Sequence, residues 1–225
     1  MNWQDIRISR DWTSFLHEGT LLFGKKFRSV LKFHAPGLAP VKQEAGWSFL
    51  NSVGEISIAG PFKSAWGFYC HLSAVEDESG WYHLLPDGHA AYPERYAWCG
   101  NFQEDLCAVS DQAGKYFHIQ PDGTRLYAAN YAYTGDFKDG LACVMLTNSH
   151  FKHIDATGTF IYDAAFKDLG VYHKGIATAK DEHGWFHIDL RGKPLYPQRY
   201  AAIEPFYNGR AFAEDFQGNK LVLPQ

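Results

Sequence analysis

A glycine recurs along this chain at intervals of 34 or 35 residues, and this period restricts the fold more than any other sequence feature. The recurring glycines are Gly19, Gly54, Gly88, Gly123, Gly158 and Gly192. A fixed period of this length is typical of proteins that stack one supersecondary unit or arrange it radially. The repeats continue without a linker from residue 12 to residue 223. We therefore predict one domain over residues 1–225, in which residues 1–11 form an N-terminal extension that either pairs with the first repeat or stays loose.

Large apolar residues, mostly aromatic, keep a constant distance from each glycine, and we call each such repeated position a column. One column lies seven residues before the glycine and others lie four, eight and fourteen residues after it. The first consists of Trp12, Trp47, Trp81, Tyr116, Phe151 and Trp185, and the last of Phe33, Phe68, Phe102, Phe137, Tyr172 and Phe206. Burying a side chain of this size contributes about 2 to 3 kcal/mol, so we expect the aromatic columns to form the core.

The remaining positions of each repeat indicate short strands and tight turns. A run of mostly small residues, such as Leu72–Val75 or Leu106–Val109, precedes a second glycine column. That column is Gly46, Gly80, Gly114, Gly184 and Gly218, with Ser149 in the remaining copy. Pro-Asp-Gly at residues 86–88 and 121–123 is typical turn chemistry, and no stretch keeps a 3.6-residue apolar period. The sequence predicts an all-β protein with about three strands in each repeat.

Two architectures bury the apolar face that each repeat would otherwise expose. One is a propeller-like ring of about six units, and the alternative is an open curved array in which the first and last units act as caps. The chain begins and ends in the middle of a repeat, which is compatible with a ring. However, Trp12–Leu16 and Asn219–Leu223 correspond to the same strand, so the two ends overlap. We favour the propeller-like ring.

Three segments carry a resemblance to a known family: Gly80-Trp-Tyr-His-Leu, Gly114-Lys-Tyr-Phe-His-Ile and Gly184-Trp-Phe-His-Ile-Asp. Together with the pairs Tyr92-Pro93 and Tyr196-Pro197, they resemble the bacterial WG repeat, also called the KWG repeat, over nearly the whole chain. The repeat starting at Ser149 and the one with Phe49 in place of histidine depart from the pattern. The resemblance implies an interaction scaffold, and it brings no set of catalytic residues.

Charge and apolar runs give little support to nucleic acid or membrane partners. The formal net charge is -4, and the one basic cluster, Lys25–Arg28 with Lys32, is short and isolated, so we do not expect nucleic acid binding. No run approaches the ~20 apolar residues of a membrane span, and the N-terminus lacks the apolar run of a signal peptide. We expect a cytoplasmic protein that contacts no membrane.

Cysteine and histidine are the residues most able to suggest a cofactor or metal. The four cysteines are Cys70, Cys99, Cys107 and Cys143, and they form no CxxC pair. We therefore expect them to be small buried residues, and we expect neither a disulfide framework nor a zinc site. One column five residues before the glycine is histidine in four copies, namely His83, His118, His153 and His187. Such a column could bind a metal or an anion. We favour a repeated local hydrogen bond, and we predict no cofactor.

Three aromatic residues lie outside the columns and are our candidates for binding. Trp98 and Tyr133 lie two residues after a column aromatic, where other copies have serine, aspartate or alanine, and Trp66 also departs from the pattern. Aromatic side chains on a scaffold often anchor a protein partner. No Ser/His/Asp arrangement or phosphate-binding loop accompanies them, so we expect no enzyme. The predicted function is protein binding, and the alternative is a glycan or small-ligand module with aromatic clefts between repeats.

Overall fold

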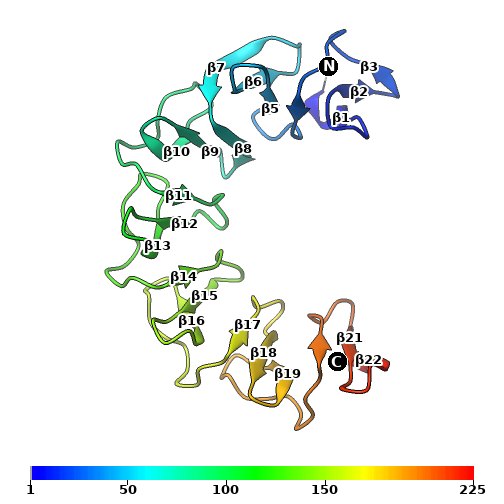
Figure 1. Cartoon of the computed structure of the whole chain (residues 1–225), viewed down its shortest axis with the longest axis vertical. Coiled ribbons are helices and arrows are strands. Elements are labelled where there is room, and N and C mark those ends of the chain that lie inside the picture. The colour runs from blue at the N-terminus through cyan, green and yellow to red at the C-terminus, as the bar shows by residue number, and fades with distance from the viewer. Residues whose placement is uncertain (1) are drawn as a thin grey trace. The chain divides into compact units, whose positions relative to one another are not determined.

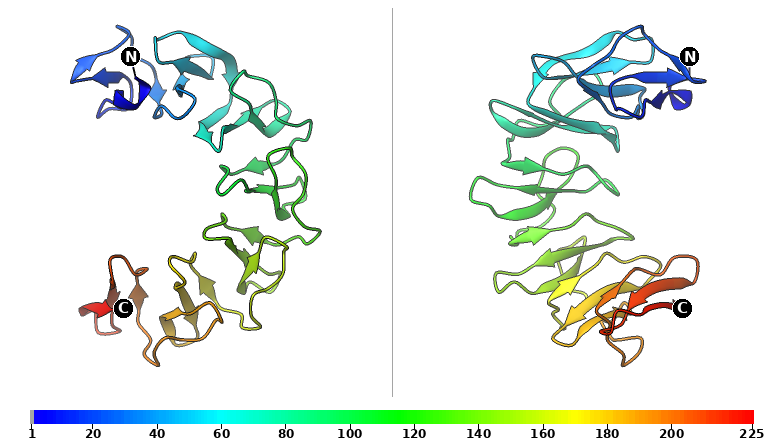
Figure 2. Two further views of the ribbon diagram at one scale, coloured as in Figure 1. Left: turned by 180° about the vertical axis from the view of Figure 1, so that it is seen from behind. Right: turned by 45° about the vertical axis from the view of Figure 1, so that its right-hand side comes forward.

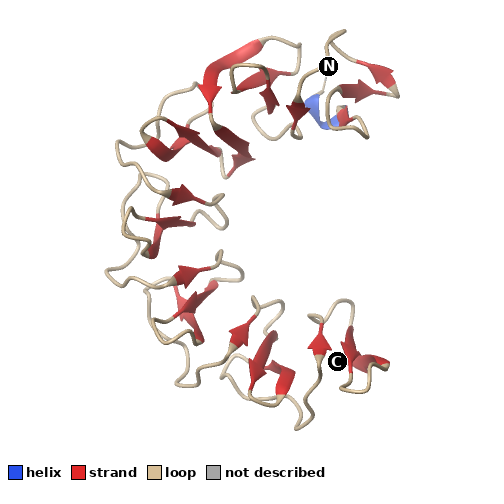
Figure 3. Cartoon of the chain, in the orientation of Figure 1, coloured by secondary structure: helices blue, strands red, loops and turns tan. Residues whose placement is uncertain are grey.

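The computed structural model describes residues 2–225, and its regular structure is almost entirely β (Figure 3). One 3-10 helix, Trp3–Asp5, precedes the strands. The first ten strands are β1 Arg7–Ile8, β2 Phe15–His17, β3 Thr20–Leu21, β4 Ser29–Val30, β5 Leu38–Lys42, β6 Trp47–Asn51, β7 Ile56–Phe62, β8 Ser64–Tyr69, β9 Leu72–Asp77 and β10 Gly80–Leu84. The other twelve are β11 Trp98–Cys99, β12 Cys107–Ser110, β13 Tyr116–Ile119, β14 Tyr133–Thr134, β15 Leu141–Met145, β16 Phe151–Asp155, β17 Asp168–Leu169, β18 Ala177–Asp181, β19 Gly184–Ile188, β20 Ala202–Ile203, β21 Arg210–Glu214 and β22 Lys220–Pro224. The predicted all-β class is confirmed.

These strands form seven small antiparallel sheets, each made of consecutive strands (Figure 1). Six sheets have three strands, and the sheet β4–β7 has four. In the three-stranded sheets β8–β10, β14–β16, β17–β19 and β20–β22, the middle strand is the run of small residues and the third strand begins at or near the second glycine column. The repeat of the sequence is therefore a repeat of sheets, with about three strands each.

The chain divides into two compact halves, which we describe separately. The N-terminal half contains the residues up to Ala113 together with Ile119–Thr124, and the C-terminal half contains Gly114–His118 and Arg125–Gln225. The division falls within the sheet β11–β13, and the other six sheets each belong to one half. In the C-terminal half the sheets β14–β16, β17–β19 and β20–β22 follow one another side by side (Figure 2).

There are seven sheets, although six recurring glycines mark the repeat, because both ends of the chain contain the same strand. Residues of the N-terminal extension pair with the first repeat, with Arg7 opposite Leu16 and Ile8 opposite Phe15, and so build a sheet around β2. The corresponding strand near the other end, β22, completes the sheet β20–β22. The overlap of the two ends that the sequence shows thus supplies one additional sheet.

The recurring glycine is required both by backbone conformation and by a close aromatic contact. Gly158 has φ +80°, a region that favours glycine, and a Cβ atom built on it would lie 2.8 Å from the ring of Tyr127. Gly123 stands in the same relation to Tyr92. The aromatic column four residues after one glycine therefore packs on the glycine of the following repeat. This contact explains why the glycine and aromatic columns keep the same period.

The predicted aromatic core is confirmed most fully by one column and is wrong at Trp12. Every member of the column fourteen residues after the glycine is buried; these are Phe33, Phe68, Phe102, Phe137, Tyr172 and Phe206. Trp12 was expected in the core, but it lies in a turn outside the strands and is 54% exposed. All four cysteines are free thiols, and Cys99, Cys107 and Cys143 are buried as predicted. Cys70 is exposed because it lies in the β8–β9 turn with φ +47°.

Candidate binding surface

The histidine column forms a repeated hydrogen-bond arrangement, which we call the clasp. In each case Nδ1 faces a tyrosine hydroxyl nine residues later, and Nε2 faces a backbone carbonyl oxygen seventeen residues later, at the first strand of the following sheet. For His118 the distances are 2.5 Å to Tyr127 and 2.8 Å to the oxygen of Gly135. The other three clasps are His83 with Tyr92 and Gly100, His153 with Tyr162 and Gly170, and His187 with Tyr196 and Glu204. The predicted repeated hydrogen bond is confirmed.

The chemistry of the clasp fixes the protonation state of the histidine. A carbonyl oxygen only accepts, so Nε2 carries the proton and donates, and Nδ1 of the neutral ring accepts from the tyrosine hydroxyl. Burial lowers the pKa of His83, His118 and His153 to about 4 from 6.5, although the carbonyl partner opposes this change. Both ring nitrogens are therefore occupied by hydrogen bonds within the protein, and the Nε2 bond joins one sheet to the next. Within residues 2–225, no group of three His, Cys, Asp or Glu side chains is placed to hold a metal ion.

The repeat with Phe49 replaces the whole clasp and not the histidine alone. Phe49 lies opposite Pro40 on β5, and the column that supplies the clasp tyrosine has Ile58 here. The carbonyl oxygen of Trp66, seventeen residues after Phe49, accepts instead from the hydroxyl of Ser73 at 2.8 Å. Three residues thus change together, so that no partner of the missing imidazole is left unpaired.

The three aromatic residues singled out from the sequence lie on first strands of their sheets and are solvent-exposed. Trp98 lies opposite Ser110 and Tyr133 opposite Met145, which places both at the same position of the repeat. Trp66 is on β8, two residues beyond the corresponding Ser64. The exposed fractions are 45% for Trp66, 36% for Trp98 and 44% for Tyr133. Tyr133 packs against Tyr116, with ring centroids 5.7 Å apart.

The basic cluster of the sequence is partly neutralised by nearby carboxylates. Arg28 forms a two-bonded ion pair with Glu44. Lys26 lies 3.7 Å from Asp11. These pairs are solvent-exposed, so they add little stability, but they reduce the positive charge that a phosphate would meet.

The last sheet differs from the two sheets before it on the face that carries the clasp histidine, which we call the forward face. In the sheet β17–β19 a row of Gly170, Thr178 and His187 crosses this face, because Gly170 N donates to Thr178 O and Thr178 lies opposite His187. The corresponding row in β14–β16 is Gly135, Cys143 and His153. In the sheet β20–β22 the row is Glu204, Phe212 and Val222. All three positions thus carry a different type of side chain in the last sheet.

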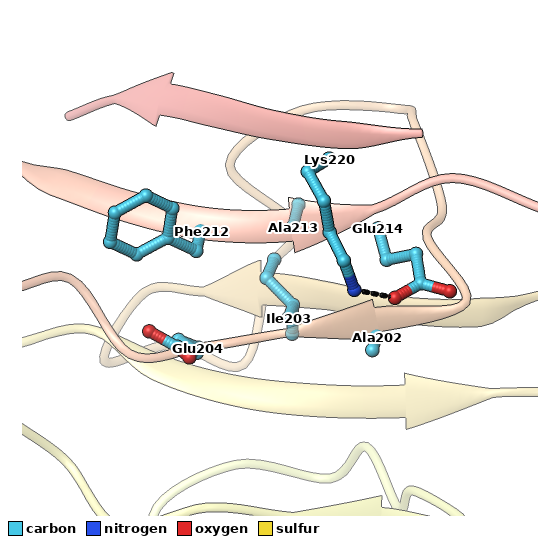
Figure 4. A pocket seen from close by; sticks show the side chains of 7 residues that line it. All are labelled: Ala202, Ile203, Glu204, Phe212, Ala213, Glu214 and Lys220. Carbon is cyan, nitrogen blue, oxygen red and sulfur yellow. Dashed lines mark hydrogen bonds and ion pairs between the residues drawn. The ribbon is translucent and has the colours of Figure 1, made fainter. Parts of the chain in front are cut away.

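Three adjoining cavities in the C-terminal half share Glu204 of this row. One of about 390 Å³ is lined by Glu204, Phe212 and the Glu214–Lys220 ion pair, among others (Figure 4). In Figure 4, Glu204 and Phe212 lie at one end of this cavity and the ion pair lies at the other. A second, of about 560 Å³, shares Glu204 and Phe212 and adds Tyr207 and Arg210.

The third cavity, of about 470 Å³, lies where the β17–β18 turn meets the segment before β21. It is lined mainly by apolar side chains, among them Val171 and Tyr207. The rings of His173 and Tyr207 are nearly parallel there, with centroids 6.5 Å apart and an angle of 20° between their planes. Glu204 and Tyr207 belong to this cavity and to the one beside it, so the three cavities form a continuous surface.

Glu204, Phe212 and Val222 are not among the binding residues predicted from the sequence. A signal was present, because Phe212 stands in a column where the other copies have a small residue: Pro40, Ala74, Ala108, Cys143 and Thr178. The significance of that departure depends on knowing which residues share a face with the histidine. The pairing of β21 with β22 supplies this information.

Comparison with known proteins identifies the fold and no family. No family model matches the sequence, and no curated protein matches it. Among solved structures, the chain is similar to BamB from Moraxella catarrhalis, with 11% identity over 96% of this chain and 78% of that chain and a TM-score of 0.53. It is also similar to Hsv2 from Kluyveromyces lactis, with 6% identity over 99% and 95% of the chains and a TM-score of 0.55. Both are β-propellers, and the predicted propeller architecture is confirmed.

The described residues include no helix long and apolar enough to cross a membrane.

Proposed function

We propose that this chain is a non-catalytic scaffold that binds another protein through Trp66, Trp98 and Tyr133. The β-propeller fold is commonly used for protein interaction, and the resemblance of the repeats to the bacterial WG family supports the same role. Nothing about the fold requires an aromatic side chain at these positions. The equivalents of Trp98 and Tyr133 in other sheets are Ser64, Asp168 and Ala202.

The observation that carries the proposal is the exposure of large aromatic side chains at positions where the repeat itself needs only a small or polar residue. Such side chains bury a large area when a partner covers them, and they lose little conformational entropy in doing so. The buried imidazoles do not compete for this role, because their nitrogens are used within the clasps. The scaffold therefore holds the aromatic residues on rigid strands and leaves their surfaces to a partner.

The uneven distribution of exposed aromatic residues favours a protein partner over the alternative glycan module. A glycan module built from this repeat is expected to show equivalent shallow clefts, one for each repeat. The position of Trp98 and Tyr133 instead carries Ser64, Asp168 and Ala202 in other sheets.

An affinity-capture experiment tests the proposal. The wild type, a Trp66→Ala, Trp98→Ala, Tyr133→Ala triple variant and a Trp12→Ala control are immobilised, and proteins retained from a lysate of the source cell are identified by mass spectrometry. Trp12 is a suitable control because it is at least as exposed as the three residues and lies outside these strands. Circular dichroism and thermal unfolding establish that each variant is folded.

We expect a protein that is retained by the wild type and the control and lost from the triple variant. Direct binding of that purified protein should weaken at least tenfold in the triple variant. Equal retention by the triple variant would show that the three aromatic residues are not the binding surface. A glycan-array signal that depends on the same residues, without a protein partner, would establish the alternative function.

A further inference from the structure

One position of the repeat, fifteen residues after the recurring glycine, lies in or beside the turn between the first two strands of a sheet. Its residue changes along the chain: His34, Tyr69, Gln103, Lys138, His173 and Tyr207. Consecutive copies both carry a ring here in only two places, namely His34 with Tyr69 and His173 with Tyr207. These two ring pairs are therefore equivalent in the repeat, and their geometries can be compared directly.

The two pairs differ in spacing and in angle. The rings of His34 and Tyr69 have centroids 4.7 Å apart and planes inclined at 51°, so they contact each other. The rings of His173 and Tyr207 are nearly parallel, at 20°, with centroids 6.5 Å apart. Both of the latter rings line the cavity of about 470 Å³, and every residue that lines this cavity belongs to the C-terminal half. We call the space between these two rings the ring slot.

The residue two positions before the second ring explains why one pair closes and the other stays open. Before Tyr69 this residue is Gly67, and a Cβ atom built on it would lie 2.6 Å from the ring of His34. Such a distance is too short, so only glycine allows the histidine to approach so closely. Before Tyr207 the equivalent residue is Pro205, which has a Cβ atom and also lines the cavity. Pro205 therefore keeps His173 from making the contact that His34 makes.

The ring slot has the dimensions and lining of a site for a flat ring. Carbon atoms in contact lie about 3.5 to 4.0 Å apart, so a ring stacked between two others needs roughly 7 Å between them. The observed 6.5 Å is within a small adjustment of that value. Val171 and Pro205 add apolar surface, whereas Lys138 and Glu204 bring opposite charges to the lining. An uncharged ring therefore fits this lining better than a charged one.

We propose that the ring slot binds an uncharged aromatic or heteroaromatic ring of a small molecule, stacked between the imidazole of His173 and the phenol ring of Tyr207. The cavity volume lies in the range typical of small-molecule sites. This site goes beyond the proposed partner binding and does not depend on it. The three aromatic residues proposed to bind a protein lie on β8, β11 and β14, away from the cavity lining.

Nuclear magnetic resonance of protein with ¹³C-labelled histidine and tyrosine rings tests the proposal. Indole and adenosine are the probes, and cyclohexanol is the control because it has a similar size to indole but is not flat. We expect indole and adenosine to shift the ring signals of His173 and Tyr207 in a saturable way, because a stacked aromatic ring shields the protons beneath it. Cyclohexanol should cause no comparable shift.

Three variants locate the binding in the slot. His173→Ala and Tyr207→Ala each remove one stacked surface and should weaken binding about tenfold. Pro205→Gly keeps both rings but restores the glycine found at Gly67, so the rings should close on each other and binding should weaken similarly. His183→Ala removes an exposed histidine of the same half and should leave binding unchanged. Circular dichroism and thermal unfolding check that each variant is folded.

Several results would overturn the proposal. One is the absence of saturable shifts with both indole and adenosine. Equal binding of cyclohexanol and indole would show an apolar cavity without preference for a flat ring. Unchanged binding by the folded Pro205→Gly variant would show that the spacing of the rings does not determine the site. The triple variant designed to remove partner binding should bind indole as the wild type does, so the two proposals fail independently.

Discussion

The Nε2 atom of His118 lies 2.8 Å from the carbonyl oxygen of Gly135, so that an imidazole on β13 is bonded to the chain just after β14. The same ring accepts a hydrogen bond from Tyr127. Each clasp therefore ties a third strand to the chain that follows it. Removing the imidazole should leave both the Tyr127 hydroxyl and the Gly135 carbonyl oxygen without this hydrogen-bond partner.

We predict that His118→Phe lowers the free energy of unfolding by about 2 to 4 kcal/mol. The substitution leaves the Tyr127 hydroxyl and the Gly135 carbonyl without their partner, and each unpaired buried polar group costs about 1 to 3 kcal/mol. Urea-induced unfolding followed by tryptophan fluorescence measures the change. The exposed His183 provides a control, because His183→Phe removes no clasp.

A triple variant should recover part of that loss. His118→Phe with Tyr127→Ile and Ala142→Ser copies the arrangement of Phe49, Ile58 and Ser73, in which the serine hydroxyl satisfies the orphaned carbonyl oxygen. Ala142 and Ser73 occupy equivalent positions of the repeat. Ser73 lies seven residues after Trp66, and Ala142 lies seven residues after Gly135, whose carbonyl oxygen would lose its partner. If the triple variant is no more stable than His118→Phe alone, the three residues do not form an exchangeable set.

Stability should decrease between pH 6.5 and about pH 4. Above pH 6.5 the clasp histidines are neutral in both the folded and the unfolded chain, so they contribute no pH dependence to the free energy of unfolding. Below it only the unfolded chain takes up protons, because burial holds the folded pKa of His83, His118 and His153 at about 4. The free energy of unfolding should then fall by at most about 1.4 kcal/mol per pH unit for each histidine.

Urea unfolding at a series of pH values measures this slope. The triple variant described above lacks one clasp histidine, so its slope over the same interval should be smaller. An unfolding free energy that stays constant from pH 6.5 to pH 5 would contradict the buried, neutral state of these rings.

Gly158→Ala should destabilise the protein more than Gly140→Ala. Both glycines have positive φ, +80° and +74°, and a left-handed alanine costs about 1 to 2 kcal/mol. A Cβ atom at Gly140 meets open space, whereas at Gly158 it meets the ring of Tyr127. Overpacking adds about 1 to 3 kcal/mol at Gly158. Thermal unfolding of the two variants compares them, and equal losses would mean that the aromatic contact does not limit the position.

Arg199→Lys should lower the free energy of unfolding by about 1 to 2 kcal/mol. The guanidinium lies 3.6 Å from the centre of the Phe186 ring, its Nε is 2.8 Å from Asp181, and its Nη1 donates to backbone carbonyls. A lysine ammonium cannot make this flat, multiply bonded contact. Arg191→Lys, at an exposed position, should have little effect in the same chemical unfolding assay. A loss confined to Arg191→Lys would contradict this prediction.

The repeat made much of the fold predictable from sequence. Gly158 and Tyr127 belong to columns of constant spacing, and a column conserved within one chain reports a contact made in every copy. The histidines were assigned to a repeated hydrogen bond on the same reasoning, and His118 with Gly135 confirms it. The prediction that Trp12 is buried was wrong, because the surroundings of Trp12 at the N-terminal sheet differ from those of its equivalents in the other copies.

The binding surface was less predictable because it consists of exceptions to the repeat. Phe212 is visible in the sequence as a large residue in a column of small ones, but its importance depends on sharing a face with Val222 and Glu204. The strand register decides which residues share a face. The loop between β21 and β22 is longer than the one between β18 and β19, so the register of one pair does not follow from the other. The exposed Trp66, Trp98 and Tyr133 were selected as departures from the pattern, and their role stays a prediction.

The clasp also bears on how a gene encoding such a chain can grow. Its histidine and its carbonyl partner lie seventeen residues apart, in His118 and Gly135 as in His153 and Gly170, and the tyrosine lies between them. A recombination that duplicates a repeat with its breakpoint inside this window separates the imidazole from its partners and joins it to those of a different copy. Because the four copies with a clasp keep the same spacing, a hybrid clasp between two of them is complete, and such copies can be added or lost in frame. The copies with Ser14 and Phe49 are the exceptions, since a breakpoint there would join an imidazole to Phe23 or Ile58.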